Sequence, residues 1–339
     1  MTNNLPSISI IIPCRNEEKF IDKCLDSIIT QDYPKEKLEI LVIDGMSNDK
    51  TREIVKGYSK QHRFIKLLDN SAKIVPTAMN TGIRDAHGEI IIRMDAHNIY
   101  EKDYISKCVR YLQEYAVDNV GGIWVTLPGS NTLIAQSIAL ALSHPFGVGN
   151  SYFRIGSKEP KYVDTVPFGC YKREVFQRIG YFNENLVRNQ DIEFNLRLKD
   201  ANGKILLVPD IVSYYHARAN LKGLFKQNFW NGYWVIYSLK FARIPFSFRH
   251  LIPFAFVLSL FGSLVASAVS KYALFLFILI AVSYGAVNVI FSLKLSRRKS
   301  LKYFPTLLLS FATLHISYGL GSLWGAIKLA LPHKRMADV

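Results

Sequence analysis

Three long stretches without charged residues occupy the C-terminal third of the chain. They are residues 251–270, 272–293 and 303–327, and none contains Asp, Glu, Lys or Arg. The hydrocarbon core of a bilayer is about 30 Å thick and is crossed by about 20 helical residues. Buried helices of water-soluble proteins rarely run this long without a charge. The sequence therefore predicts transmembrane helices within residues 250–331.

The positive charge of the chain lies in the same third. The formal net charge is +15; residues 1–218 contain 28 Lys and Arg against 26 Asp and Glu, whereas residues 219–339 contain 14 against a single acid. A basic protein can bind nucleic acid. Here the basic part is also the most apolar part, so the sequence favours a membrane as the partner and no nucleic acid.

Basic residues also predict the orientation of the spans. One cluster precedes the first span and another, residues 294–302, follows the second. Cytoplasmic loops are enriched in Lys and Arg, and two spans return the chain to its starting side. Residues 1–6 show no signal peptide. We therefore expect a multi-pass protein of the cell (inner) membrane with a cytoplasmic N-terminal domain, residues 1–218.

Two further segments border the predicted spans. Residues 219–249 mix aromatic and basic side chains, which is typical of a helix lying in the headgroup region, although an ordinary amphipathic helix would look similar. The third apolar stretch contains Pro305 and several glycines, and it can cross the bilayer, re-enter it or pack against the other two. Residues 332–339 form a basic tail.

The first hundred residues alternate between strand and helix patterns. Continuous apolar runs predict buried strands, and apolar residues at helical spacing predict the helices between them. This order indicates an α/β fold with a doubly wound, mostly parallel sheet. The predicted strands are residues 7–13, 38–44, 64–68 and 89–95, and the predicted helices are 17–30, 51–59 and 72–86.

Polar side chains follow three of these strands. The groups are residues 14–17, Asp44 with Gly45, and Asp95 with His97. Because ligands of such sheets bind beyond the carboxyl ends of the strands, we expect the three groups to form one site. The four cysteines are scattered without a Cys-x-x-Cys pair, so buried thiols are expected rather than zinc or disulfides.

Asp95 and His97 are candidate metal ligands. Alternate residues of an extended segment share a face, so both side chains can reach one ion. A hard divalent ion such as Mn²⁺ or Mg²⁺, held by few protein ligands, completes its shell with phosphate oxygens. Taken alone the pattern is weak, and a surface turn is the alternative.

Two other acids have structural alternatives. Asp44 ends a strand and can accept a hydrogen bond from a nucleotide base or ribose, or it can hold a turn. Asp49 fits a helix cap better. Asp191 stands in the first turn of a predicted helix, where an acid is commonly a cap.

Four sequence runs resemble inverting family 2 glycosyltransferases with the GT-A fold. They occur in the family's order between Pro6 and about Arg218, and Asp-Ala-His followed by C-terminal spans most resembles the exopolysaccharide enzymes of the succinoglycan-synthesis type. The runs are PSISIIIPCRNEEKFIDKCLDSI, LVIDGMSNDKT, NTGIRDAHGEIIIRMDAH and FGCYKREVFQRIGYFNENLVRNQDIEFNLRL.

The chain departs from the family pattern at several positions. Gly45 replaces the second Asp of the nucleotide-contacting segment, His97 replaces the last acid of the metal motif, and Gln190 replaces the Glu that precedes the base. His97 remains a competent ligand. The Gln-x-x-Arg-Trp motif of processive synthases is matched poorly, by residues 227–230, so a single-addition enzyme is expected.

The resemblance assigns roles to individual residues. It implies that Asp95 and His97 hold the metal ion, which neutralises the diphosphate leaving group, and that Asp191 is the catalytic base that deprotonates the acceptor. His216 is a possible further ligand for the metal or the diphosphate, or a structural histidine, and Lys73 can meet a phosphate or lie in solvent. The implied donor- and nucleotide-binding residues are Pro13, Arg15, Glu17, Asp44, Lys73 and Asp95.

Together these features predict an inverting, metal-dependent glycosyltransferase. The expected donor is a nucleotide sugar, with a UDP-sugar preferred, and the expected acceptor is a polyprenyl-diphosphate-linked saccharide in the synthesis of a cell-surface polysaccharide or glycan. The alternatives are a polyprenyl-monophosphate glycosyltransferase and a non-catalytic nucleotide-binding membrane module. A nucleotide-sugar pyrophosphorylase would have a Gly-rich phosphate loop and no spans, and neither feature matches.

Overall fold

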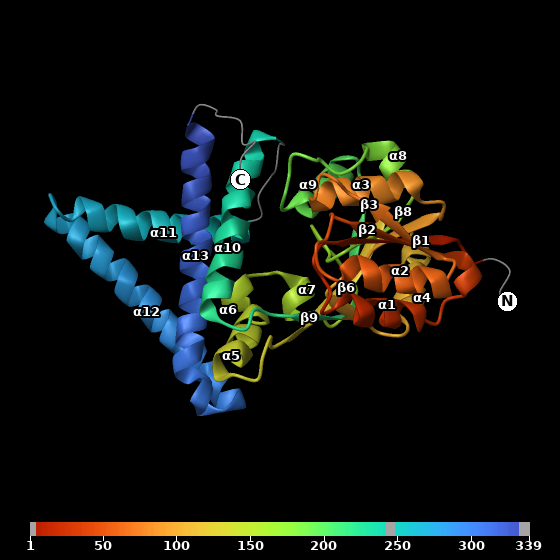
Figure 1. The fold of residues 1–339 in the computed structure, drawn as a ribbon. Coiled ribbons are helices and arrows are strands. Elements are labelled where there is room, and N and C mark those ends of the chain that lie inside the picture. Colours follow the sequence, from red (N-terminus) through yellow and green to blue (C-terminus); the bar gives the residue numbers. More distant parts are fainter. Residues whose placement is uncertain (1–4, 242–247, 332–339) are drawn as a thin grey trace. The chain divides into compact units, whose positions relative to one another are not determined.

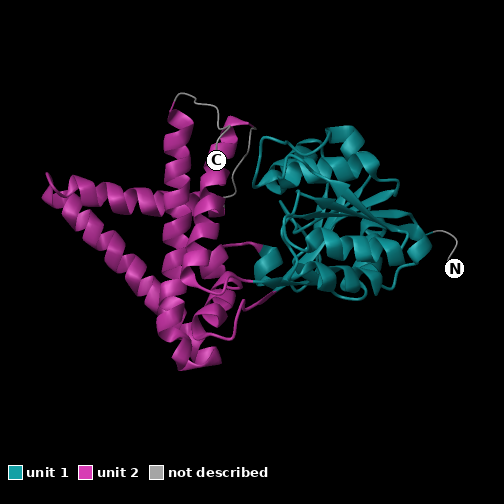
Figure 2. Ribbon diagram, viewed as in Figure 1, with its two compact units in different colours: residues 1–125, 152–216 teal, residues 126–151, 217–339 magenta. Residues whose placement is uncertain are grey.

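The computed structural model describes residues 5–241 and 248–331. The chain divides into two compact units, each drawn in its own colour in Figure 2. The first contains residues 1–125 and 152–216, and the second contains residues 126–151 and 217–339. The predicted basic tail, residues 332–339, lies outside the described residues.

The first unit is built on one mixed sheet (Figure 1). Its strand order is β3-β2-β1-β4-β8-β6-β9-β5, and β7 pairs with β9. The pairs β3–β2, β2–β1 and β1–β4 are parallel, whereas β8 pairs antiparallel to β4 and to β6. The strands are β1 Ile8–Cys14, β2 Leu38–Asp44, β3 Ile65–Asp69, β4 Ile90–Arg93, β5 Asn98–Tyr100, β6 Asn119–Leu127, β7 Lys161–Tyr162, β8 Cys170–Lys172 and β9 Ile205–His216.

Helices cover both faces of this sheet because successive side chains of a buried strand point to opposite faces. Ile10 and Ile12 of β1 pack into the cluster that contains α1, α2 and α4, while Ile11 packs into the cluster with α3, α8 and α9. All three side chains are fully buried. The helices are α1 Ile21–Ile29, α2 Thr51–Gln61, α3 Val75–Asp85, α4 Tyr104–Glu114, α7 Tyr152–Ile155, α8 Glu174–Ile179 and α9 Gln190–Asp200, with the short 3₁₀ turn η1 at Lys35–Lys37.

The fold class and the first four strands agree with the sequence analysis, but the end of the fourth strand does not. β4 ends at Arg93, two residues before the predicted end, and Ala96 and His97 lie in the turn that leads to β5. The alternation argument therefore does not apply to Asp95 and His97. The four cysteines are free and buried, as predicted.

The second unit is helical. Its described residues include three helices long and apolar enough to cross a membrane, which match the three predicted spans. Residues 126–151 were assigned to the N-terminal domain in the sequence analysis, but they pack with these helices; the division into cytoplasmic, interfacial and membrane parts stays a prediction. The elements are α5 Leu133–Leu142, α6 Pro145–Val148, α10 Leu221–Tyr237, η2 Ser238–Lys240, α11 Phe248–Ala266, α12 Lys271–Lys299, η3 Leu301–Tyr303 and α13 Phe304–Ala330.

Helices α10 and α13 run side by side at very short distance (Figure 1). A Cβ atom added to Gly321 of α13 would lie 1.9 Å from the carbonyl oxygen of Phe229, and one added to Gly232 of α10 would lie 2.0 Å from that of Tyr318. Only glycine permits this approach, which is typical of packed helices in membranes. The segment predicted to lie at the membrane interface is thus helical and packs along α13.

A histidine connects α13 to the inserted segment. His315 Nε2 lies 2.7 Å from the carbonyl oxygen of Phe146 in α6, and its Nδ1 lies 3.0 Å from the hydroxyl of Tyr284 in α12. Ser137 of α5 and Thr306 of α13 add a hydroxyl pair at 2.6 Å. These polar contacts explain why residues 126–151 belong to the helical unit.

Candidate active site

The loops that follow β1 and β2 are fastened together by hydrogen bonds. The Asn16 amide donates to Ser47 Oγ at 2.8 Å, the Asn48 amide donates to Asn16 Oδ1 at 3.0 Å, and the Glu17 amide donates to Thr51 Oγ1 at 2.7 Å. Asn16 adopts a left-handed conformation with φ of 56°. Two of the three predicted polar groups are therefore adjacent, as expected.

Asp44 is the anchor of this pair of loops. Its side chain is completely buried, and its carboxylate accepts from Ser47 Oγ, from the Ser47 amide at 3.0 Å and from Arg52 Nη1 at 2.6 Å. Burial opposes ionisation, but the bonds from Ser47 and Arg52 outweigh it and lower the pKa of Asp44. This carboxylate has no exposed surface and holds the turn that follows β2, and its direct contact with a nucleotide stays a prediction. Asp49 stands two residues before α2, whose N-cap is Lys50, and accepts from the Thr51 amide at 3.0 Å.

Arg93 holds Asp95 beyond the end of β4. Arg93 Nε donates to Asp95 Oδ1 at 2.8 Å and Nη2 donates to Oδ2 at 3.1 Å, a bidentate pair whose two side chains are 11% and 19% exposed. The hydroxyl of Tyr100 contacts the Asp95 amide at 2.7 Å. Such a fork fixes the plane of the carboxylate, and lone pairs on both oxygens remain for a further ligand.

His97 meets the loop after β1. Its Nδ1 lies 3.2 Å from Glu17 Oε1, so the third polar group joins the first. A carboxylate at one ring nitrogen orients a histidine for metal binding at the other. Asn98 pairs with Tyr215 in the antiparallel β5–β9 ladder, which places His216 one step further along, beside His97.

The donor set can be tested against a divalent ion. In the described part of the chain, no three His, Cys, Asp or Glu side chains are placed to hold an ion together. Asp95 and His97 alone provide one carboxylate and one imidazole, and an ion held by few protein ligands keeps positions for phosphate oxygens. The chemistry of these two side chains suits Mn²⁺ or Mg²⁺ bound together with a substrate, and the role of His216 as a further ligand stays a prediction.

Asp191 lies near the same arginine. It is the second residue of α9, which begins after Asn189 in a left-handed conformation with φ of 60°. Burial opposes the charge of Arg93, but the carboxylates of Asp95 and Asp191 raise the pKa of its guanidinium. The predicted base and one predicted metal ligand thus both interact electrostatically with this guanidinium. Sequence analysis missed Arg93, although a charged residue within the run Ile-Ile-Ile-Arg signals a buried partner.

Glu193 is not a second candidate base. Its side chain is 5% exposed and is held by Arg197, whose Nε and Nη2 donate to its two oxygens at 2.5 and 3.0 Å. Lys73 is exposed in a left-handed turn before α3, and Arg15 is exposed beside Gly45. Pro13 is the penultimate residue of β1.

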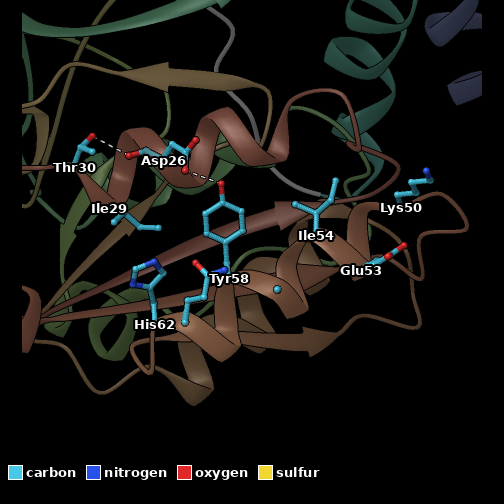
Figure 3. A pocket seen from close by; sticks show the side chains of 10 residues that line it. Asp26, Ile29, Thr30, Lys50, Glu53, Ile54, Tyr58 and His62 are labelled. Carbon is cyan, nitrogen blue, oxygen red and sulfur yellow. Dashed lines mark hydrogen bonds between the residues drawn. The ribbon is translucent and has the colours of Figure 1, made fainter.

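A surface pocket of about 780 Å³ lies between α1 and α2 (Figure 3). It is lined by Asp26, Ile29, Tyr58 and His62 among others, and the hydroxyl of Tyr58 donates to Asp26 Oδ1 at 2.6 Å. None of the predicted site residues lines this pocket. The candidate active site is therefore the strand-end group around Arg93.

Comparison with known proteins decides the family. Residues 9–180 match the model of "Glycosyl transferase family 2". The chain is also 34% identical over 266 residues to dolichyl N-acetyl-α-D-glucosaminyl phosphate 3-β-D-2,3-diacetamido-2,3-dideoxy-β-D-glucuronosyltransferase of Methanococcus voltae. The aligned region covers 76% of this chain and 81% of the relative. The chain belongs to glycosyl transferase family 2. It is a glycosyltransferase, as the sequence motifs predict.

Two further similarities bear on the expectations. The succinoglycan biosynthesis protein ExoA of Rhizobium meliloti is 28% identical over 260 residues, covering 76% of this chain and 77% of the relative, in agreement with the predicted resemblance. The mannosyltransferase PcManGT of Pyrobaculum calidifontis, solved with GDP-Man and Mn²⁺, has a TM-score of 0.62 at 22% identity and covers 95% of this chain and 88% of its own. This likeness confirms the GT-A fold.

Proposed function

We propose that this glycosyltransferase transfers a sugar from a nucleotide-sugar donor to a membrane lipid-linked saccharide, with inversion at the anomeric carbon and with a divalent metal ion. The observation that carries the proposal is the group around Arg93. Asp95, a proposed metal ligand, is paired with Arg93, and Asp191, proposed to deprotonate the acceptor, interacts electrostatically with the same guanidinium; His97, the other proposed ligand, contacts Glu17.

In this proposal each residue has a separate task. Asp95, oriented by Arg93, and His97, oriented by Glu17, would hold the ion, which supplies charge neutralisation for the diphosphate leaving group. Asp44 keeps the loop of residues 45–50 in place against the β1 loop, where a nucleotide would bind. Asp191 accepts the proton of the acceptor hydroxyl as the new bond forms. One base and no separate nucleophile describe a single displacement, which inverts configuration.

Similar proteins support the donor and the acceptor classes. The Methanococcus voltae relative is named for a dolichyl sugar phosphate, and the PcManGT structure contains a nucleotide sugar with Mn²⁺. The three long apolar helices of this chain suit an enzyme whose acceptor is itself a lipid. We propose a UDP-sugar as donor, a polyprenyl-diphosphate-linked saccharide as acceptor and a catalytic domain on the cytoplasmic side. The named phosphate of the relative favours a monophosphate-linked acceptor as the second candidate.

A transfer screen tests this function. The full chain in membranes is incubated with a panel of UDP- and GDP-sugars, Mn²⁺, and polyprenyl monophosphate- or diphosphate-linked saccharides. We expect one donor to give a labelled lipid product and EDTA to abolish it. Transfer that continues at full rate in EDTA would contradict the metal assignment, and no transfer with any lipid acceptor would contradict the acceptor class.

A further inference from the structure

Arg154 of α7 is surrounded by aromatic rings of the first unit. Its guanidinium carbon lies 4.7 Å from the ring centre of Trp124, 5.3 Å from that of Tyr215 and 5.4 Å from that of Phe153. Trp124 and Tyr215 are stacked at 4.8 Å, and Trp124 also contacts Phe168. Trp124 comes from β6 and Tyr215 from β9, whereas Phe153 precedes Arg154 in α7, so two distant strands meet at one cation.

This cation lacks the partner that a buried arginine normally has. Nη1 of Arg154 is buried without a hydrogen-bond partner, and Nε1 of Trp124 is in the same condition. Among the described residues, no Asp or Glu forms an ion pair with Arg154. Burial lowers the pKa of its guanidinium, and Tyr215 opposes this. Burying a cation without an ion-pair partner costs free energy, and so does burying an indole N–H without a hydrogen-bond acceptor. A negatively charged ligand that accepts hydrogen bonds would reduce both costs.

The position of the cluster indicates what that ligand is. Tyr215 is the ladder partner of Asn98, the residue after His97. Phe168 packs edge-on against Tyr100, whose hydroxyl contacts the Asp95 amide. The aromatic cluster around Arg154 therefore borders the two proposed metal ligands, where substrate phosphates are expected.

We propose that Arg154, together with the indole N–H of Trp124, binds a phosphate group of a substrate of this enzyme. The inference rests on the proposed function and extends it, because it adds a phosphate contact outside the metal pair. A planar guanidinium stacked on rings presents its fork in a fixed plane, which suits bidentate phosphate recognition. The donor diphosphate and the lipid phosphate share this chemistry, and the experiment distinguishes them.

A purely structural role of Arg154 and a phosphate-binding role predict opposite effects of its replacement on the melting temperature. If Arg154 only bound its aromatic neighbours together, Arg154→Met would lower the melting temperature of the protein. If it awaits a phosphate, removing the unpaired charge leaves the ligand-free protein as stable or more stable, and weakens anion binding. Arg197 is the matched control, because it also lies against a ring, Phe194 at 5.2 Å, but is paired with Glu193.

The experiment measures inorganic pyrophosphate binding and thermal unfolding of the full chain in detergent. For Arg154→Met we expect an unchanged or higher melting temperature without ligand and a loss of pyrophosphate affinity of about 10- to 100-fold, as for one charge-assisted contact. Arg154→Lys, which keeps the charge but not the fork, should be intermediate. Arg197→Met should melt lower and bind pyrophosphate as wild type does. An Arg154→Met protein that melts lower, as Arg197→Met does, and keeps full affinity would overturn the proposal.

Two further measurements identify the phosphate. If Arg154→Met also weakens binding of UDP or GDP, the group belongs to the donor; if it leaves both unchanged but raises the KM for the lipid acceptor, the group belongs to the acceptor. Either result supports the phosphate site. An Arg154→Met protein with unchanged UDP and GDP binding and an unchanged KM for the lipid acceptor would refute it. A wild-type protein that binds pyrophosphate through Arg154 but transfers no sugar would refute the proposed function alone.

Discussion

Replacing Asp44 by Asn distinguishes an anchor of the nucleotide loop from a direct nucleotide ligand. Asn keeps the size of the side chain, and its amide nitrogen can face Ser47 Oγ while its oxygen still accepts from the Ser47 amide and from Arg52. What is lost is the negative charge, which the structure places 2.6 Å from the guanidinium and entirely out of solvent.

The magnitude follows from those contacts. A hydrogen bond to a charged group contributes about 1.5–3 kcal/mol and a neutral one about 1 kcal/mol, so weakening the bonds from Arg52 and Ser47 should cost about 2 kcal/mol. For a unit of this size that lowers the melting temperature by about 4–8 °C. Asp69→Asn is the matched control: Asp69 binds the same arginine at 2.8 Å but is 60% exposed, and surface pairs contribute about 0–1 kcal/mol.

The assay compares melting temperature and nucleotide affinity of the two variants in detergent. Because the folded-state pKa of Asp44 is lowered, its contribution is present above the unfolded value of about 3.9 and is lost as pH falls through the folded value. The gap between wild type and Asp44→Asn should therefore narrow below about pH 4. An unchanged melting temperature combined with a large loss of nucleotide affinity would refute the anchoring role.

Two other predictions concern the support of the site and the sheet. Glu17→Ala should raise the Mn²⁺ concentration for half-maximal activity by about 10- to 100-fold, since the carboxylate orients His97, whereas Glu18→Ala should change it little; equal effects would argue against the orienting contact. Burial opposes ionisation of Glu39, but bonds from neighbouring donors lower its pKa to about 2, so its stabilisation, present above pH 4.5, is lost as pH falls toward 2. In Glu39→Gln the free energy of unfolding should depend less on pH over that range. A pH dependence equal to that of the wild type would contradict this.

The parallel half of the sheet could be predicted because its strands are continuous apolar runs. Ile8–Cys14 and Leu38–Asp44 are buried along almost their whole length, which leaves a clear signal in the sequence. The short strands β5, β7 and β8 contain two or three residues each and leave none. The inserted segment 126–151 packs with the helical unit, and its apolar pattern does not reveal this.

In the candidate site, too, residues within short motifs could be predicted, whereas contacts between distant segments could not. Asp95, His97 and Asp191 stand in recognisable motifs, whereas Arg154 meets Trp124 and Tyr215 only through the tertiary fold. The burial of Asp44 also depends on neighbours from another loop. The sequence motifs predicted which side chains lie near the strand ends. Which of these side chains are exposed to a ligand depends on the packing of the folded chain.

The most direct test of the account is the turnover of Asp191→Asn, measured beside its affinity for the donor. Asn keeps the size of the side chain and most of its hydrogen-bonding capacity but does not take up the acceptor's proton. Positioned base catalysis contributes about 10²- to 10⁴-fold, so we expect turnover to fall by that factor while donor affinity changes little. Glu193 offers no replacement, because Arg197 holds both of its oxygens. Near-normal turnover in Asp191→Asn would contradict the account, since the mechanism would then have no base.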